Sequence, residues 1–237
     1  MKFAIIAAGE GSRLANEGVV TPKPLVRLNS ETMIDRLIRI FSANDASSVS
    51  IIVNKEMNEV YEHINGLKLP FPLHIIHKST PSSMHSFYEL SHTLANDRFC
   101  LTTVDTVFRE DEFTRYIDAF RESTADGLFA VTDYIDDEKP LYVETGENMI
   151  IKGFHDEKPF NANYISGGIF CLGNNSLPIL KASIEAGMFR LRNYQRQLVA
   201  NGLKLQAWPF SKIIDVDHQE DIHKAGLFLQ NNSYNEK

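Results

Sequence analysis

A short apolar run near the N-terminus ends in a glycine-rich turn that also carries an arginine. Residues 3–7 are Phe-Ala-Ile-Ile-Ala, and Gly9, Gly11, Ser12 and Arg13 follow them. A buried strand that ends in such a turn can present its backbone N–H groups to a phosphate. The same pattern also occurs in dinucleotide-binding units, in P-loops and in ordinary tight turns, so the turn alone does not decide between them.

A second cation lies further along the same predicted loop. Lys23 stands between Pro22 and Pro24. Each proline fixes its own φ angle, so the pair stiffens the chain around the lysine and holds its ammonium group in place. Two cations, Arg13 and Lys23, on one phosphate-binding loop indicate a triphosphate ligand.

Two of the alternatives fail on spacing. A dinucleotide-binding loop needs a third glycine where this sequence has Leu14, because bulk there prevents close helix–sheet packing. We also expect no helix directly after the turn, since Gly18, Pro22 and Pro24 keep the chain in a loop until about Glu31. A P-loop needs Lys followed by Ser or Thr at a fixed distance after a glycine, and the sequence has no such pair.

Composition limits the class of protein. The chain has 237 residues, of which 43% are hydrophobic, and a formal net charge of −7. This acidic balance argues against nucleic acid as the main partner, although a small polyanion can still bind at a local basic cluster or through a divalent cation. No apolar stretch approaches the roughly 18–20 residues of a membrane span. Cys100 and Cys171 lie in apolar segments, so we expect buried free thiols and a cytoplasmic setting.

The order of apolar patterns predicts an α/β fold. In the first half strand-like runs alternate with helical patterns, which indicates a mostly parallel sheet with helices on both faces. The second half is less regular, with a hairpin that turns near residues 146–148. We expect a three-layer α/β/α, Rossmann-like fold with an embellished C-terminal half, in a single domain over residues 1–237. The expected strands include residues 3–7, 49–54, 73–78, 99–105, 127–134 and 164–172, and the expected helices include residues 33–41, 83–94 and 110–122.

Several motifs resemble those of one known superfamily and occur in the same order. They are AAGEGSRL and TPKPLVRL within residues 7–28, TVDTVF at 103–108, GFHDEKP at 153–159, YISGGIFCL at 164–172 and IIDVDHQEDIHKA at 213–225. The set closely resembles the nucleoside-triphosphate transferase superfamily, which includes the sugar-1-phosphate nucleotidyltransferases and their MobA-like relatives. The resemblance implies a GT-A-like mixed sheet. It also implies a nucleotide-binding half at residues 1–134 and a half for the sugar phosphate and the metal at residues 135–237.

The resemblance further implies a reaction and its residues. A sugar 1-phosphate attacks the α-phosphate of a nucleoside triphosphate, forming an NDP-sugar and pyrophosphate with the help of Mg²⁺. In such a transfer the protein mainly positions two anions and neutralises charge, and here Arg13 and Lys23 would be the catalytic residues. The matching nucleotide-binding positions are Ala7, Ala8, Gly9, Gly11, Ser12, Arg13, Lys23, Ser82, Ser83 and Asp105, the substrate-binding positions are Glu157, Lys158 and Gly168, and the metal ligands are Asp105 with Asp215 or Asp217.

The chain departs from the family pattern at two places, and the first of them leaves the nucleobase open. Family members commonly have Gly-Thr-Ala where this chain has Pro-Ser-Ser-Met at residues 81–84, and many have glycine in place of Val104. The sequence also leaves open the sugar phosphate and the oligomeric state. Alternative functions are a nucleotidyltransferase for a non-sugar phosphate such as phosphocholine, a glycosyltransferase that uses a nucleotide sugar, and a non-catalytic sensor of nucleotides or nucleotide sugars.

Simpler structural interpretations compete with the site residues. Asp105 can cap the turn after its strand, and Asp215 and Asp217 can complement the dipole of the helix that follows them. Glu157 and Lys158 can form a solvated surface pair.

Overall fold

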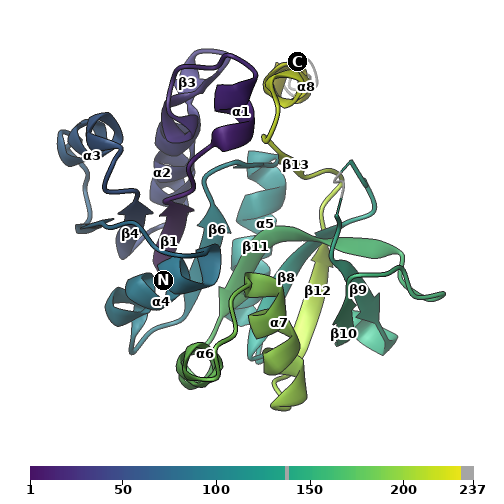
Figure 1. The fold of residues 1–237 in the computed structure, drawn as a ribbon. Coiled ribbons are helices and arrows are strands. Elements are labelled where there is room, and N and C mark those ends of the chain that lie inside the picture. Colours follow the sequence, from purple (N-terminus) through teal and green to yellow (C-terminus); the bar gives the residue numbers. More distant parts are fainter. Residues whose placement is uncertain (137–138, 231–237) are drawn as a thin grey trace.

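A mixed sheet of nine strands runs through both halves of the sequence (Figure 1). The computed structural model describes residues 1–136 and 139–230. The strands are β1 (Lys2–Ala7), β4 (Ser48–Val53), β5 (Leu73–His77), β6 (Phe99–Thr103), β8 (Gly127–Thr132), β9 (Tyr142–Thr145), β10 (Ile151–His155), β11 (Tyr164–Leu172) and β12 (Leu205–Pro209). The order is β10-β9-β11-β6-β1-β4-β5, and β8 pairs with both β11 and β12.

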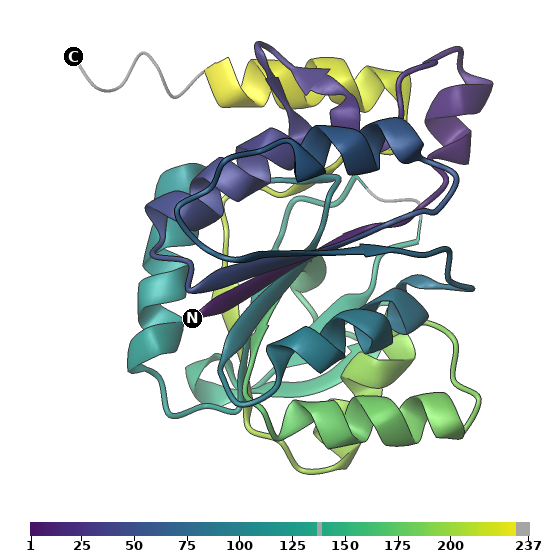
Figure 2. The ribbon, with the colours of Figure 1, turned by 90° about the vertical axis from the view of Figure 1, so that its left-hand side faces the viewer.

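Helices cover both faces of this sheet. They are α1 (Ser12–Asn16), α2 (Met33–Ala43), α3 (Asn58–Asn65), α4 (Ser83–Leu94), α5 (Glu110–Glu122), α6 (Ser176–Glu185), α7 (Leu191–Ala200) and α8 (Gln219–Gln230). Phe3 and Ile5 of β1 pack in a core with α2, α3, α5 and α8, whereas Ala4 and Ile6 pack in a second core with α4, α6 and α7. Figure 2 shows the sheet between these two layers, which confirms the expected three-layer α/β/α fold. None of the helices in the described part of the chain is long and apolar enough to cross a membrane.

The parallel part of the sheet gathers its loops at one edge. β1 is parallel to β4 and β6, and β4 is parallel to β5, so these four strands end on the same side. The antiparallel strand β11 joins this part to the second half through β6 and β8. Ligands of open α/β sheets bind at the carboxyl ends of the strands. This edge is therefore where the loops after β1, β5 and β6 can build a site.

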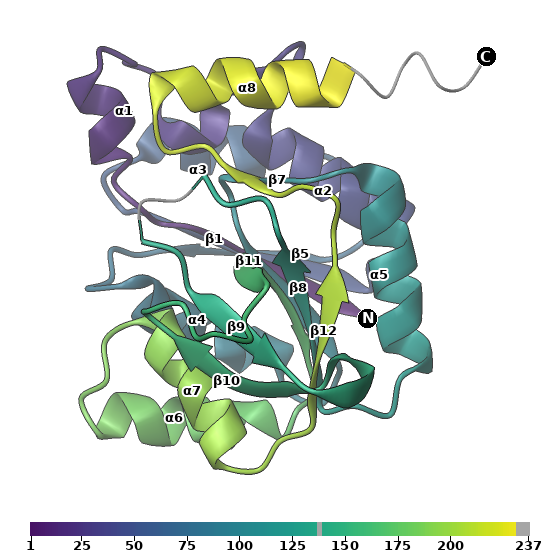
Figure 3. The same cartoon turned by 90° about the vertical axis from the view of Figure 1, so that its right-hand side faces the viewer.

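Two short ribbons lie outside the main sheet. β2 (Arg27–Leu28) pairs with β3 (Glu31–Thr32), and β7 (Thr106–Val107) pairs with β13 (Ile214–Asp215), which lies below α8 in Figure 3. Both pairings are antiparallel. The second ribbon joins segments about a hundred residues apart in sequence, and it carries the C-terminal acidic segment back to the end of β6.

The expected loop after the glycine turn was wrong. The short helix α1 begins directly after Gly11, and a 3₁₀ turn, Lys23–Leu25, and the β2–β3 ribbon precede α2. Leu14 is the one buried side chain of α1, so the helix leaves no periodic apolar pattern in the sequence. Gly18 follows with φ +90°, a conformation that glycine adopts without strain. The eight-residue helix α3 was also not predicted.

The prediction of buried free thiols is confirmed. Cys100 of β6 and Cys171 of β11 lie opposite each other, and both are free and fully buried. The Tyr116 hydroxyl of α5 accepts a hydrogen bond from the Cys171 N–H at 3.0 Å and donates one to the Leu128 carbonyl oxygen at 2.6 Å. These bonds attach α5 to the two strands beneath it.

A glycine in β11 gives a stability prediction. A Cβ atom at Gly167 would overlap Ile213 Cδ1 and lie 3.3 Å from the Ala130 carbonyl oxygen. We predict that Gly167→Ala lowers the free energy of unfolding by about 1–3 kcal/mol, because the methyl group must displace packed atoms. Denaturant unfolding measures this loss. The control is Gly66→Ala, whose Cβ would lie 3.4 Å from the nearest atom. An equal loss in both variants would contradict the prediction.

Candidate active site

A cavity of about 600 Å³ opens at the carboxyl edge of β1 and β6. One wall is the glycine turn after β1, the opposite wall is the segment that leads into α4, and the floor is the end of β6. Its lining residues are Ile6, Ala8, Gly9, Glu10, Gly11, Ser12, Arg13, Lys23, Pro24, Thr80, Pro81, Ser82, Ser83, Ser86, Thr103, Val104, Asp105 and Asp217. The structure thus brings together most residues that the sequence indicated for the nucleotide.

The glycine turn and the lysine segment pack directly on each other. Gly11 has φ +63°, and a Cβ there would lie 3.1 Å from the Lys23 Cβ. A larger residue would therefore be strained and would also push Lys23 away. At Gly9 a Cβ would meet no described atom within 4 Å, so this position faces open space. The sequence thus places an open turn beside a lysine held against it.

Two cations and two carboxylates form one ion-pair cluster. Lys23 Nζ lies 2.5 Å from Asp105 Oδ2 and 2.7 Å from Asp217 Oδ1, and Arg13 Nη1 lies 2.6 Å from Asp217 Oδ2. The Lys23 side chain is only 9% exposed, whereas that of Arg13 is 57% exposed. The cluster therefore extends from a buried ammonium group to a solvent-facing guanidinium group.

The surroundings of Lys23 and Asp217 favour the charged form of both side chains. Burial disfavours the ammonium form of Lys23, but the Asp105 and Asp217 carboxylates outweigh it and raise the pKa of the lysine above its usual value. Burial likewise acts to raise the pKa of Asp217, but Lys23 and Arg13 hold it below the usual value. Each buried charge is therefore stabilised by an opposite charge from a distant part of the chain.

The β7–β13 ribbon brings the two aspartates together. Asp105 stands before β7 and Asp217 after β13, and the Val216 N–H donates to the Asp105 carbonyl oxygen at 3.0 Å. Asp221 at the start of α8 holds the next turn, because its Oδ2 accepts from the N–H groups of Asp217 at 3.1 Å and of His218 at 2.8 Å. The carboxylates therefore converge through main-chain bonds as well as through Lys23.

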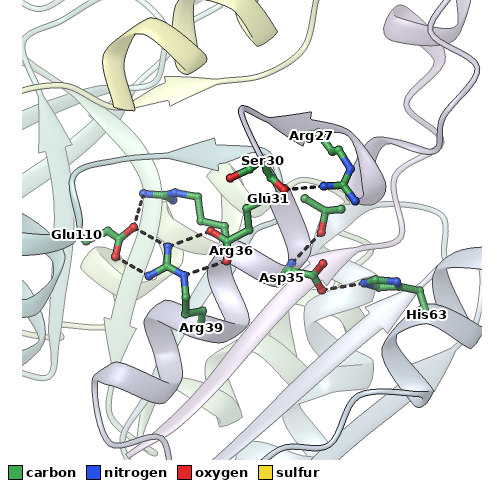
Figure 4. Close-up of polar contacts among 9 residues, drawn as sticks. Arg27, Ser30, Glu31, Asp35, Arg36, Arg39, His63 and Glu110 are labelled. Carbon is green, nitrogen blue, oxygen red and sulfur yellow. Dashed lines mark hydrogen bonds and ion pairs between the residues drawn. The ribbon is translucent and has the colours of Figure 1, made fainter. Parts of the chain in front are cut away.

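An ion-pair network supports the far end of the same ribbon (Figure 4). Arg36 of α2 is buried, donates to the carbonyl oxygen of Phe108 at 2.5 Å and has its guanidinium over the Phe108 ring. Its burial lowers its pKa to about 10 despite the nearby Glu110. Arg39 pairs with both Glu31 and Glu110. These contacts fix β3, α2 and the start of α5 around the segment that follows Asp105.

Asp105 and Asp217 form a donor set that fits a divalent ion. One oxygen of each carboxylate contacts the Lys23 ammonium group, so the two side chains already face a common cation, and a metal ion would bind beside this group. Mg²⁺ prefers oxygen ligands and is usually held by one or two carboxylates together with substrate phosphates. In residues 1–136 and 139–230 no group of three or more His, Cys, Asp or Glu side chains could hold a metal ion, so such an ion would rely on ligand oxygens.

Asp215 does not line the larger cavity that holds this pair. It is exposed on β13, paired in register with Thr106, and lines a second cavity of about 200 Å³. Arg13 and Asp217 line both cavities and so separate them. Of the two aspartates that the sequence left open, Asp217 is therefore the one that lines the larger cavity with Asp105 and shares the Lys23 ammonium group with it.

Hydroxyl groups line the wall at the start of α4. Ser82 is the N-cap residue, and its Oγ accepts from the His85 N–H at 3.4 Å and lies 2.8 Å from His85 Nδ1. Thr80 Oγ1 lies 2.6 Å from Ser86 Oγ. Sequence reasoning found Ser82 and Ser83 but missed Thr80 and Ser86. The available signal for Ser86 was its spacing, four residues after Ser82 and three after Ser83, which places it on the same helix face.

The residues predicted for the second substrate are less concentrated. Among the described residues, Glu157 and Lys158 line neither cavity, and both are exposed on the segment after β10. Gly168 lies in β11 with φ +73°, and a Cβ there would lie 3.3 Å from Thr106 Oγ1 and 3.9 Å from Thr103 Oγ1. Thr103 lines the larger cavity, so Gly168 borders it from behind.

Ala7 stands at the inner end of the glycine turn. It is the buried last residue of β1, and it is absent from the cavity lining, although its neighbours Ile6 and Ala8 belong to it.

Comparison with known proteins assigns the chain to a family. Residues 3–153 match the model of the MobA-like NTP transferase domain. The chain is 22% identical, over 97% of its length, to the bifunctional protein GlmU of Thermodesulfovibrio yellowstonii, but it spans only about half (52%) of that relative. It is 27% identical to the choline-phosphate cytidylyltransferase of Streptococcus pneumoniae, over 65% of this chain and 68% of that protein.

A solved structure shares the whole fold. A putative glucose-1-phosphate thymidylyltransferase from Bacillus anthracis, solved in complex with a sucrose, aligns over 98% of this chain and 96% of its own, with a TM-score of 0.84 and 19% identity. This likeness agrees with the GT-A-like sheet expected from the sequence. Because the family model matches more than half of the residues, including the glycine turn, Lys23 and Asp105, the chain belongs to the family of MobA-like NTP transferase domains.

Proposed function

We propose that this protein transfers a nucleotidyl group from a nucleoside triphosphate to a sugar 1-phosphate, forming an NDP-sugar and pyrophosphate. The observation that carries the proposal is the convergence of Arg13, Lys23, Asp105 and Asp217 beside an open glycine turn in one cavity. A triphosphate needs cations and backbone N–H groups, and both are available on this wall. The family assignment supports the transferase class.

Each half of the chain has its own task in this proposal. Residues 1–134 bind the nucleotide: the turn from Ala7 to Arg13 holds the β- and γ-phosphates, and the base lies against the hydroxyl wall near Ser82 and Ser83. Lys23 contacts the α-phosphate and stabilises the negative charge of the departing pyrophosphate. Because Lys23 is buried and already fixed by its neighbours, it needs little reorganisation during the reaction.

Asp105 and Asp217 would hold Mg²⁺, and this ion would neutralise charge on the phosphates. The carboxylates themselves position Lys23 and Arg13 until a triphosphate engages these cations. Arg13 is the more exposed of the two cations, so it is the first that an incoming anion meets.

Residues 135–237 provide the acceptor side. Glu157 and Lys158 contact the sugar and its phosphate, and Gly168 lets the acceptor approach the strand behind the cavity. Glu157 and Lys158 are exposed, so both side chains are accessible to the acceptor. A phosphocholine-type acceptor is the second candidate, because the choline-phosphate cytidylyltransferase has 27% identity over 65% of the chain.

The proposal predicts pyrophosphate release that needs three components together. UTP, CTP, dTTP and GTP are each combined with aldose 1-phosphates or phosphocholine, with and without Mg²⁺. Pyrophosphate should appear only with a triphosphate, an acceptor and the ion all present. Turnover with phosphocholine as the acceptor, but with none of the aldose 1-phosphates, would favour the second candidate. Tight nucleotide binding without turnover in any mixture would instead identify a sensor and refute the enzyme.

Removing the buried ammonium group should abolish most of the activity. We predict that Lys23→Met lowers kcat/KM by about 100- to 1,000-fold, since the charge that stabilises the departing pyrophosphate is lost. The matched control is Lys55→Met, which removes a lysine whose side chain is 63% exposed and paired with Glu56. Circular dichroism shows whether both variants fold. A Lys23 variant as active as the Lys55 variant would remove Lys23 from the mechanism.

Substitutions at the two C-terminal aspartates should affect turnover and Mg²⁺ dependence differently. Asp217→Asn is expected to lower turnover by about 100-fold and to raise the Mg²⁺ concentration at half-maximal rate, because an amide binds the ion more weakly than a carboxylate. Asp215→Asn, two residues away on the neighbouring cavity, should change neither value by more than about twofold. The Mg²⁺ dependence of initial rates measures both effects. The reverse ranking would assign the metal to Asp215.

A further inference from the structure

Glu17, at the end of α1, contacts the start of α8. Its Oε1 lies 2.6 Å from His218 Nδ1, and its Oε2 accepts from the Gln219 N–H at 2.7 Å. Figures 2 and 3 show α1 beside the first turn of α8. These bonds join segments 201 and 202 residues apart in the sequence. The carboxylate therefore caps α8 from outside that helix.

The electrostatics of this contact are favourable on both sides. The Gln219 N–H and the His218 side chain hold the pKa of Glu17 below its usual value, and the Glu17 carboxylate raises the pKa of His218. Negative charge at a helix N-terminus is also stabilised by the helix dipole. The Glu17 carboxylate thus uses one oxygen for each of its two partners.

Arg13 of α1 and the C-cap residue Glu17 contact consecutive residues of the C-terminal segment. Arg13 pairs with Asp217 at 2.6 Å, and Glu17, four residues further along, holds the two residues that follow. The Glu17 N–H also donates to the Arg13 carbonyl oxygen at 3.1 Å, so the two contacts come from one turn of the chain. The glycine turn and Asp217 are thereby fixed relative to each other, by Arg13 in the lining of the cavity and by Glu17 outside that lining.

We propose that Glu17 is a positioning residue for Asp217, and that it sets the distance between the triphosphate-binding turn and the metal-binding carboxylate. Glu17 is absent from the lining of the cavity, so it acts only through α1 and α8. This inference rests on the proposed function. The specific consequence is that loss of Glu17 reduces the gain in nucleotide affinity that Mg²⁺ provides. The glycine turn, Arg13 and Lys23 bind the triphosphate whether or not Glu17 is present.

Calorimetry can separate these contributions. The wild type, Glu17→Ala and Glu17→Gln are each titrated with UTP, CTP, dTTP and GTP, once in excess Mg²⁺ and once in EDTA. The ratio of the affinity in Mg²⁺ to the affinity in EDTA should fall about tenfold in Glu17→Ala, while the affinity in EDTA stays within about twofold of the wild type. Glu17→Gln should keep most of the ratio, because its amide oxygen can still accept the Gln219 N–H.

The matched control is Glu112→Ala. Glu112 also binds a distant segment through two bonds, from the Ser211 N–H and the Ser211 hydroxyl, both at 3.0 Å. Its loss should lower the unfolding temperature about as much as the loss of Glu17 but leave the Mg²⁺ ratio intact. A wild-type ratio in Glu17→Ala overturns the inference, and so does an equal loss of affinity with and without Mg²⁺. If the wild type binds none of the four nucleotides, the proposed function itself fails.

Discussion

The buried ammonium group of Lys23 is the constraint on which the site depends. An isolated charge with 9% exposure would be very unfavourable, so the fold must supply opposite charges at hydrogen-bond distance. It supplies two, Asp105 and Asp217, at 2.5 and 2.7 Å. Both carboxylates follow Lys23 far along the sequence, Asp105 from the middle of the chain and Asp217 from near its C-terminus. The position of the C-terminal segment is thus fixed by a charge near the N-terminus.

The topology explains how such distant groups can meet. Parallel strands β1, β4, β5 and β6 deliver their following loops to one edge, and the β7–β13 ribbon returns residue 217 to the same place. The Asp221 and Glu17 contacts then fix the turn from Asp217 into α8. A site of this kind is rigid because backbone bonds hold its charged side chains, and such preorganisation favours the stabilisation of developing charge.

The sequence predicted elements with a strong apolar period and missed those without one. The strand at 164–172 and the helix at 110–122 agree with β11 and α5 because several buried residues repeat along each of them. The helix α1 buries only Leu14, so local glycine and proline signals favoured a loop there. In the site, Arg13, Lys23 and Asp105 were found because each stands in a recognisable local motif. The choice between Asp215 and Asp217 was not possible, since it depends on how a two-residue strand pairs with β7.

Charge balance links the resting cluster to the proposed reaction. In the described structure the positive charges of Arg13 and Lys23 are matched by Asp105 and Asp217, within a protein whose formal net charge is −7. A triphosphate that takes over the two cations leaves two partly buried carboxylates without partners, which is unfavourable. A divalent cation that arrives with the triphosphate restores the balance. The requirement for Mg²⁺ in our proposal therefore follows from the need to compensate these carboxylates, in addition to the family resemblance.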